Sequence, residues 1–74
     1  TMNAAVIRTA LIYTAYIKRM QNTFDRTELA WMEDDRNRLH NEFLDALKEA
    51  KMKISRPASE VLAWKIRDDY TDPA

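Results

Sequence analysis

Apolar residues recur every three or four positions along two long stretches of this chain. The first set is Val6, Ala10, Tyr13, Ile17, Met20 and Phe24. The second set, interrupted by one arginine, is Leu29, Met32, Arg36, Leu39, Phe43, Ala46 and Ala50. This spacing places each set on one face of an α-helix and does not suit a strand, whose side chains alternate between two faces. The pattern therefore predicts an all-α fold.

The predicted helices span residues 4–21, 26–54 and 57–69, in one domain over residues 2–70 with a frayed tail at 71–74. Asn3 is the expected N-cap of the first helix, and Asn22 is the expected left-handed residue after it. Asp25 and Glu28 have the spacing of a capping box, which opens the second helix. Because no Pro or Gly lies between the first two helices, one continuous helix is the alternative.

Pro57 marks the boundary between the second and third helices, because the residue before a proline avoids the helical region. Proline itself suits the first turn of a helix. The predicted inner face of the third helix consists of Ala58, Val61, Leu62, Ile66 and Tyr70. Trp64 lies at the margin of this face.

The apolar face of the first helix is wider than one neighbouring helix can cover. Ile7, Leu11 and Ala15 form a second row beside the first set. A chain of 74 residues also buries only about 60% of its surface, and it has no cysteine for a disulfide. We therefore expect a long antiparallel helical hairpin plus a short third helix, completed as a bundle by dimerisation.

The composition argues against several kinds of chemistry. The chain has no glycine, which excludes glycine-rich phosphate loops, and no cysteine, which excludes thiolate metal sites. Its single histidine, His40, lacks the second histidine and the Glu-x-x-His spacing of a di-metal bundle, and we expect it to be a half-exposed helix residue. We predict no enzymatic activity, no cofactor and no metal, and a cytoplasmic location.

Basic residues gather around the predicted end of the second helix, at Lys48, Lys51, Lys53 and Arg56. They are candidate phosphate contacts for a nucleic acid. The alternative is that they complement the negative end of the helix dipole. Net charge is zero, so no charge excess of the whole chain favours nucleic acid. Residues 4–20 also leave open an interfacial membrane helix. The stretch with a single charge, residues 4–17, is too short to span a bilayer.

The candidate interface residues come from the second apolar row of the first helix, from the aromatic residues, and from the arginine within the second apolar set. They are Ile7, Leu11, Tyr13, Tyr16, Trp31, Arg36 and Trp64. The alternative for the aromatics is ordinary packing at the core edge. Arg36 lies within an apolar set, so either its head reaches solvent or it forms an ion pair across an interface. The preferred function is a non-enzymatic protein–protein interaction module, a regulatory adaptor or inhibitor that docks on a larger protein and forms a homodimer.

Short segments of the chain resemble the Hha/YmoA family of small helical modulators that associate with nucleoid proteins. They are Glu28-Leu29-Ala30, Arg38-Leu39, Pro57, Val61 and Trp64-Lys65-Ile66-Arg67, and they cover about half of the chain with gaps. Residues 4–21 lack the arginine-rich N-terminal segment of that family. The resemblance implies the alternative function, a nucleic-acid- or nucleoid-associated modulator of transcription.

Overall fold

The computed structural model describes residues 3–71, and these form three helices and no strand. Helix α1 is Ala4–Gln21, α2 is Arg26–Glu49 and α3 is Arg56–Thr71. The all-α fold is confirmed for this part of the chain. The predicted tail, apart from Thr71, lies outside the described residues.

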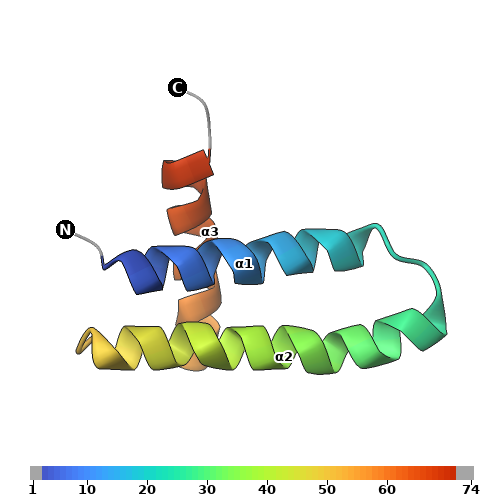
Figure 1. Ribbon diagram of the computed structural model, residues 1–74, viewed down its shortest axis with the longest axis horizontal. Coiled ribbons are helices and arrows are strands. Elements are labelled where there is room, and N and C mark those ends of the chain that lie inside the picture. Colours follow the sequence, from blue (N-terminus) through green and yellow to red (C-terminus); the bar gives the residue numbers. More distant parts are fainter. Residues whose placement is uncertain (1–2, 72–74) are drawn as a thin grey trace.

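The three helices are arranged as a pair crossed by the third. Helices α1 and α2 lie side by side and are joined at one end by residues 22–25, while α3 runs steeply across the back of both (Figure 1). Contacts between the pair fix their register. Tyr13 lies beside His40, and Tyr16 forms a hydrogen bond with Asp35. Later residues of α1 therefore lie beside earlier residues of α2.

Side-chain caps begin both α1 and α2, and the second cap lies at the break between them. Asn3 Oδ1 accepts a bond of 2.7 Å from the Ala5 amide, and Asp25 Oδ1 accepts bonds of 2.8 and 3.2 Å from the amides of Thr27 and Glu28. The alternative of one continuous helix is therefore wrong. Asn22 does end α1, but its φ of −103° is not left-handed, so the conformation predicted for it is also wrong.

Helix α2 ends at Glu49, five residues before the predicted end at Ile54. Lys51 has a φ of 60°, and the amide of Met52 donates to the carbonyl of Leu47, which is the Schellman pattern of helix termination. By the register of the pair, Glu49 is level with the start of α1. A longer α2 would therefore have no neighbour, whereas the turn lets Met52 and Ile54 pack against the core.

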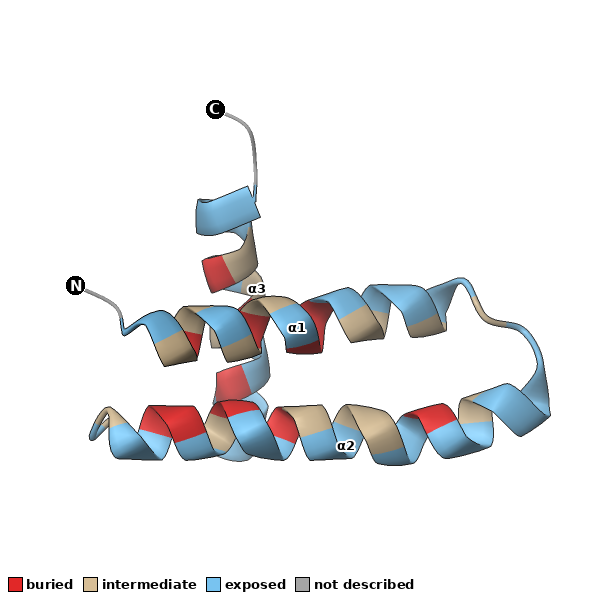
Figure 2. Cartoon of the chain, in the orientation of Figure 1, coloured by how far each residue is buried: buried red, intermediate tan, exposed pale blue. Residues whose placement is uncertain are grey.

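The core lies where the three helices face one another, as the buried positions in Figure 2 show. Its fully enclosed side chains include Val6, Tyr13, Phe43 and Leu47, and Ile66 contributes from α3. Most predicted core positions of α1 and α2 are buried or half-buried. Phe24 is the exception, because it falls in the connecting loop and is 88% exposed.

The face of α3 that packs inward is only partly the predicted one: Ile66 is buried and Leu62 packs against the core, as predicted. Ala58, Val61 and Tyr70 are exposed, whereas Ser59 and Ala63 are fully buried. Small side chains at these two positions let the backbone of α3 approach the other helices closely. The start of α3 is one residue before Pro57, and its end extends two residues past Asp69.

Candidate functional site

The three helices each contribute one polar side chain to a buried group that we call the junction cluster: Tyr13, His40 and Ser59. The Tyr13 hydroxyl lies 3.1 Å from His40 Nδ1, and His40 Nε2 lies 2.7 Å from Ser59 Oγ. The rings of Tyr13 and His40 are stacked, with centroids 4.5 Å apart. His40 is only 6% exposed, so the prediction of a half-exposed histidine is wrong.

The hydrogen bonds of the junction cluster determine where its protons lie. Ser59 Oγ donates to the carbonyl of Arg56 at 2.6 Å, so the Nε2–H of His40 must donate to Ser59. In neutral His40, Nδ1 then accepts from the Tyr13 hydroxyl, which also donates to Glu60 Oε1 over a longer distance of 3.4 Å. A catalytic serine instead donates its hydroxyl hydrogen to the histidine, and it must be accessible to substrate. Ser59 is fully buried, so this contact between serine and histidine serves packing.

Burial shifts the pKa values of both rings. It lowers the pKa of His40 below 6.5, and the neighbouring Arg56 guanidinium lowers this pKa further. Burial also raises the pKa of Tyr13 to about 12, and the negative charge of the Glu60 carboxylate contributes to this rise. At neutral pH the junction cluster is therefore uncharged, which suits its buried position.

An open hollow of about 390 Å³, which we call the junction hollow, lies beside the junction cluster. Besides Tyr13, His40 and Pro57 it is lined by Arg36, Asn37, Arg56 and Glu60. Arg56 Nη1 donates to Asn41 Oδ1 at 2.8 Å, and the Tyr13 hydroxyl lies 3.4 Å from Glu60 Oε1. The sequence alone did not indicate that Arg36, Arg56 and Glu60 lie around one hollow, because residues 56–60 of α3 reach α2 only in the tertiary structure.

Arg36 is half-buried and lines the junction hollow. Within residues 3–71 the ion pairs are those of Arg38, with Asp35 and Glu42, so Arg36 has no carboxylate partner in the described chain. A half-buried arginine that lines an open hollow is compatible with a head that reaches solvent, and the ion pair across an interface stays a prediction.

A second surface, which we call the outer face, lies on the side of α1 and α2 away from α3. It consists of Ile12, Tyr16, Trp31 and Leu39. Ile12 and Leu39 line one shallow depression, the Tyr16 hydroxyl donates to Asp35 Oδ2 at 3.0 Å, and Trp31 lies one helical turn before Asp35. Ile12 is 48% and Trp31 46% exposed.

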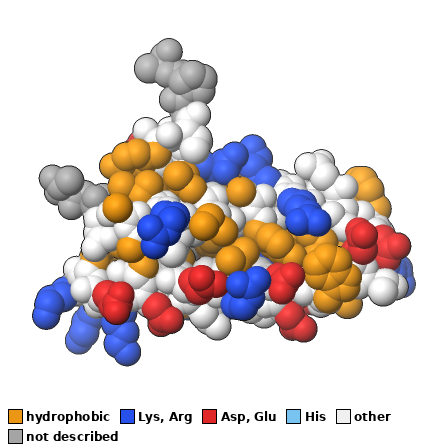
Figure 3. Space-filling model, viewed as in Figure 1, with side chains coloured by type: hydrophobic (Ala, Val, Ile, Leu, Met, Phe, Trp, Pro, Cys, Tyr) orange, Lys and Arg blue, Asp and Glu red, His pale blue; other side chains and the backbone are white. Residues whose placement is uncertain are grey.

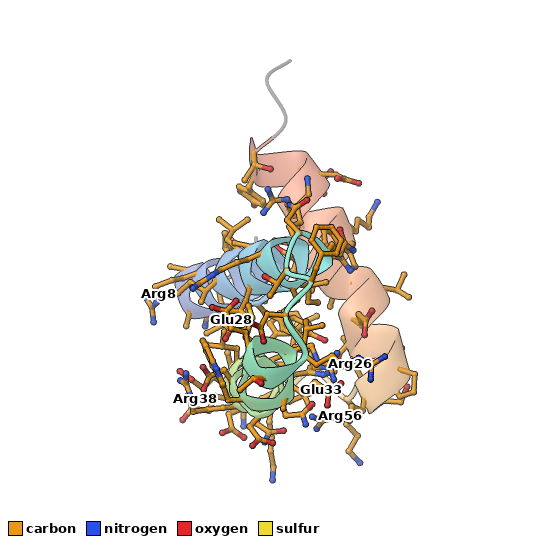
Figure 4. The ribbon with its side chains drawn as sticks, turned by 90° about the vertical axis from the view of Figure 1, so that its right-hand side faces the viewer. Arg8, Arg26, Glu28, Glu33, Arg38 and Arg56 are labelled. Atoms are coloured by element: carbon orange, nitrogen blue, oxygen red, sulfur yellow. The ribbon has the colours of Figure 1, made fainter. Side chains whose placement is uncertain are left out.

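Two views place the outer face. Figure 4 shows the Arg8 and Arg38 side chains projecting away from α3, and Arg38 pairs with Asp35 beside the outer face. Figure 3 shows hydrophobic side chains exposed over α1 and α2 on this side of the molecule. Large apolar side chains gathered on a surface are typical of an interaction site.

The predicted interface residues do not form one surface. Tyr16 and Trp31 belong to the outer face, whereas Tyr13 and Arg36 lie at the junction, with Tyr13 only 1% exposed. The remaining three are half-buried: Ile7, Leu11 and Trp64. Sequence reasoning did not select Ile12 and Leu39 for the interface. Their spacing to Tyr16 and Trp31 was visible, but the register that joins them was not.

The predicted phosphate contacts are all exposed, but they divide between two places. Lys48 and Lys53 line an open hollow of about 540 Å³ near the end of α2, together with Leu44 and Met52. Lys51 is the left-handed residue of the same turn. Basic side chains gather at this end of α2 in Figure 3. Arg56 instead lies at the junction hollow.

Residues 3–71 also bear on whether the chain could cross a membrane or hold a metal ion. None of the described helices has the length and apolar character to cross a membrane. No group of three or more histidine and carboxylate side chains in this part of the chain is placed to hold a metal ion.

The chain matches no protein-family model, no curated protein and no solved structure. The resemblance to the Hha/YmoA family therefore depends on the short segments named above.

Proposed function

We propose that this chain is a small, non-enzymatic protein–protein interaction module that works as a homodimer and docks on a larger protein as a regulatory adaptor or inhibitor. The observation that carries the proposal is the outer face. Ile12 and Trp31 expose about half of their side chains there, although the core of so short a chain needs apolar surface for itself. Covering this face with another helical surface removes that apolar area from water.

Charge on the two sides of the outer face favours a second copy as its occupant. On α1, the basic residues Arg8 and Arg19 flank it, with the Arg19 guanidinium 5.8 Å from the centre of the Tyr16 ring. On α2, the carboxylates of Asp35 and Glu42 flank it, with Arg38 between them, so this side has a charge of −2 + 1 = −1. One side is therefore basic and the other acidic.

A two-fold axis parallel to the helices makes these charges complementary. It places α1 of each copy against α2 of its partner, so that the basic edge of one copy meets the acidic edge of the other. The four helices would then form a bundle with antiparallel neighbours, the arrangement in which such helices pack most commonly. The same surface patch serves both copies, as a two-fold interface requires.

Sedimentation velocity over a wide range of protein concentration tests this proposal. We expect the native chain to shift from monomer to dimer as concentration rises. Ile12→Arg places two unpaired charges in the proposed interface, so it should raise the dimer dissociation constant by about tenfold or more. Val61→Arg is the matched control, because Val61 is 72% exposed on α3, away from the outer face.

Two results would contradict the dimer. One is a native chain that stays monomeric at every concentration, and the other is an equal effect of Ile12→Arg and Val61→Arg. Helix content measured by circular dichroism must be unchanged in both variants, so that a loss of association is not a loss of folding.

A nucleic-acid function is the second candidate, favoured by the exposed lysines around the end of α2. Lys48, Lys51 and Lys53 form no ion pair within the described residues. Fluorescence anisotropy on labelled duplex DNA should then show binding that weakens steeply with salt. Lys48→Gln with Lys53→Gln should weaken it further, while Lys65→Gln on α3 should not. Absence of binding at about 50 mM salt would exclude this candidate.

A further inference from the structure

The junction hollow gathers two arginines from different helices around one open space. Arg36 comes from α2 and Arg56 from the first residue of α3, twenty positions later. Neither guanidinium has a carboxylate within ion-pair distance in residues 3–71. Arg56 is partly fixed by its bond to Asn41, which leaves other N–H groups of its fork free to donate.

The surroundings make an unpaired arginine costly in the free protein. Arg36 is half-buried, so part of its hydration is lost, and the nearby neutral His40 supplies no negative charge to offset that loss. Among the described residues, the acid that lines the junction hollow is Glu60, whose carboxylate is close to the Tyr13 hydroxyl. Two arginines and one glutamate leave a net charge of +2 − 1 = +1 around an open space.

We propose that the junction hollow binds a phosphate group, held between the guanidinium groups of Arg36 and Arg56. Guanidinium forks donate two parallel hydrogen bonds to oxyanions. A tetrahedral phosphate presents oxygens in several directions, so it can accept from two forks that approach from different helices, whereas the two oxygens of a carboxylate lie in one plane. The side-chain amide of Asn37 lines the same space and supplies a further donor.

The size of the junction hollow indicates the kind of ligand. At about 390 Å³ it falls within the usual range of small-molecule sites, and it is larger than inorganic phosphate needs. The junction hollow therefore has room for a small phosphate ester whose remainder would lie beside Pro57 at the start of α3. This site is separate from the outer face, so it does not depend on the proposed dimer.

The test is a titration of the native chain with inorganic phosphate and with phenyl phosphate, followed by amide and histidine-ring NMR signals at constant ionic strength. Both ligands should shift the signals of His40 and of the residues around it. Tighter binding of phenyl phosphate would identify an ester as the source of the group, and equal or tighter binding of inorganic phosphate would identify the free ion.

Three variants decide whether the arginines hold the ligand. Arg36→Gln removes a charged fork, so affinity should fall by about tenfold or more. Glu60→Gln removes the one negative charge of the site, so affinity should rise several-fold. Arg38→Gln is the matched control, since Arg38 lies on the same helix but pairs with Asp35 and Glu42 on the other side, and affinity should not change.

The proposal is overturned if neither ligand shifts the His40 signals, or if the shifts follow the exposed lysines instead. It is also overturned if Arg36→Gln and Arg38→Gln weaken binding equally. The gain expected from Glu60→Gln keeps the test valid even if Arg36→Gln fails to fold, because an unchanged affinity in Glu60→Gln would contradict the site by itself.

Discussion

Replacing Phe43 by alanine should remove most of the stability of this chain. The Phe43 side chain is fully buried, and its ring stacks near that of Tyr13 with centroids 6.3 Å apart. Truncating a buried phenylalanine costs about 3–5 kcal/mol, through lost burial and the cavity that remains. At roughly 0.05–0.15 kcal/mol per residue, a chain of this length has a total stability of about 4–11 kcal/mol. So short a chain should lie near the low end of that range, where this loss would leave the variant close to unfolded at room temperature.

Urea denaturation followed by tryptophan fluorescence measures this loss of free energy. Asp45→Ala is the control on the same helix, because Asp45 is exposed and its replacement should cost less than about 0.5 kcal/mol. Ile17→Ala should fall between the two, since Ile17 is half-buried against the core. Equal losses for Phe43→Ala and Asp45→Ala would refute the packing of α1 on α2 described above.

Three other predictions follow from local features. The lowered pKa of His40 means that the unfolded state takes up a proton first, so stability should be full above pH 6.5 and decrease below it; in urea titrations, His40→Gln should flatten this dependence. The raised pKa of Tyr13 should make one tyrosine ionise near pH 12 in an absorbance titration, and Tyr13→Phe should abolish that step. Lys51→Gly should raise the melting temperature, because glycine relieves about 1 kcal/mol of left-handed strain, whereas Lys48→Gly within α2 should lower it.

Caps and periodicity made the first two helices predictable. Asn3 and Asp25 form the side-chain bonds that their positions suggested, so the start of each helix followed from local chemistry. The end of α2 did not, because the sequence there continues a helical pattern through Ile54. The chain turns at Lys51 because α1 provides no surface beyond that level, and this depends on how the two helices are aligned.

The candidate sites were predictable only in part for the same reason. Tyr16 and Trp31 could be selected as aromatics outside the main apolar sets, but only the register of α1 on α2 joins them with Ile12 and Leu39 in the outer face. Arg36 was recognisable as an unusual residue, but the neighbours that give it a role come from α3.

The sequence by itself determined that this chain is helical and where α1 and α2 begin, because spacing and capping act over a few neighbouring residues. Only the tertiary structure decided the crossing of α3, which buries Ser59 and Ala63 in place of Val61. An apolar residue at the helix surface is not enough to make that face pack inward. The small residues on the other face of α3 allow its backbone to approach α1 and α2 more closely. There the Ser59 hydroxyl forms a hydrogen bond with His40, which lies nineteen positions earlier in the chain.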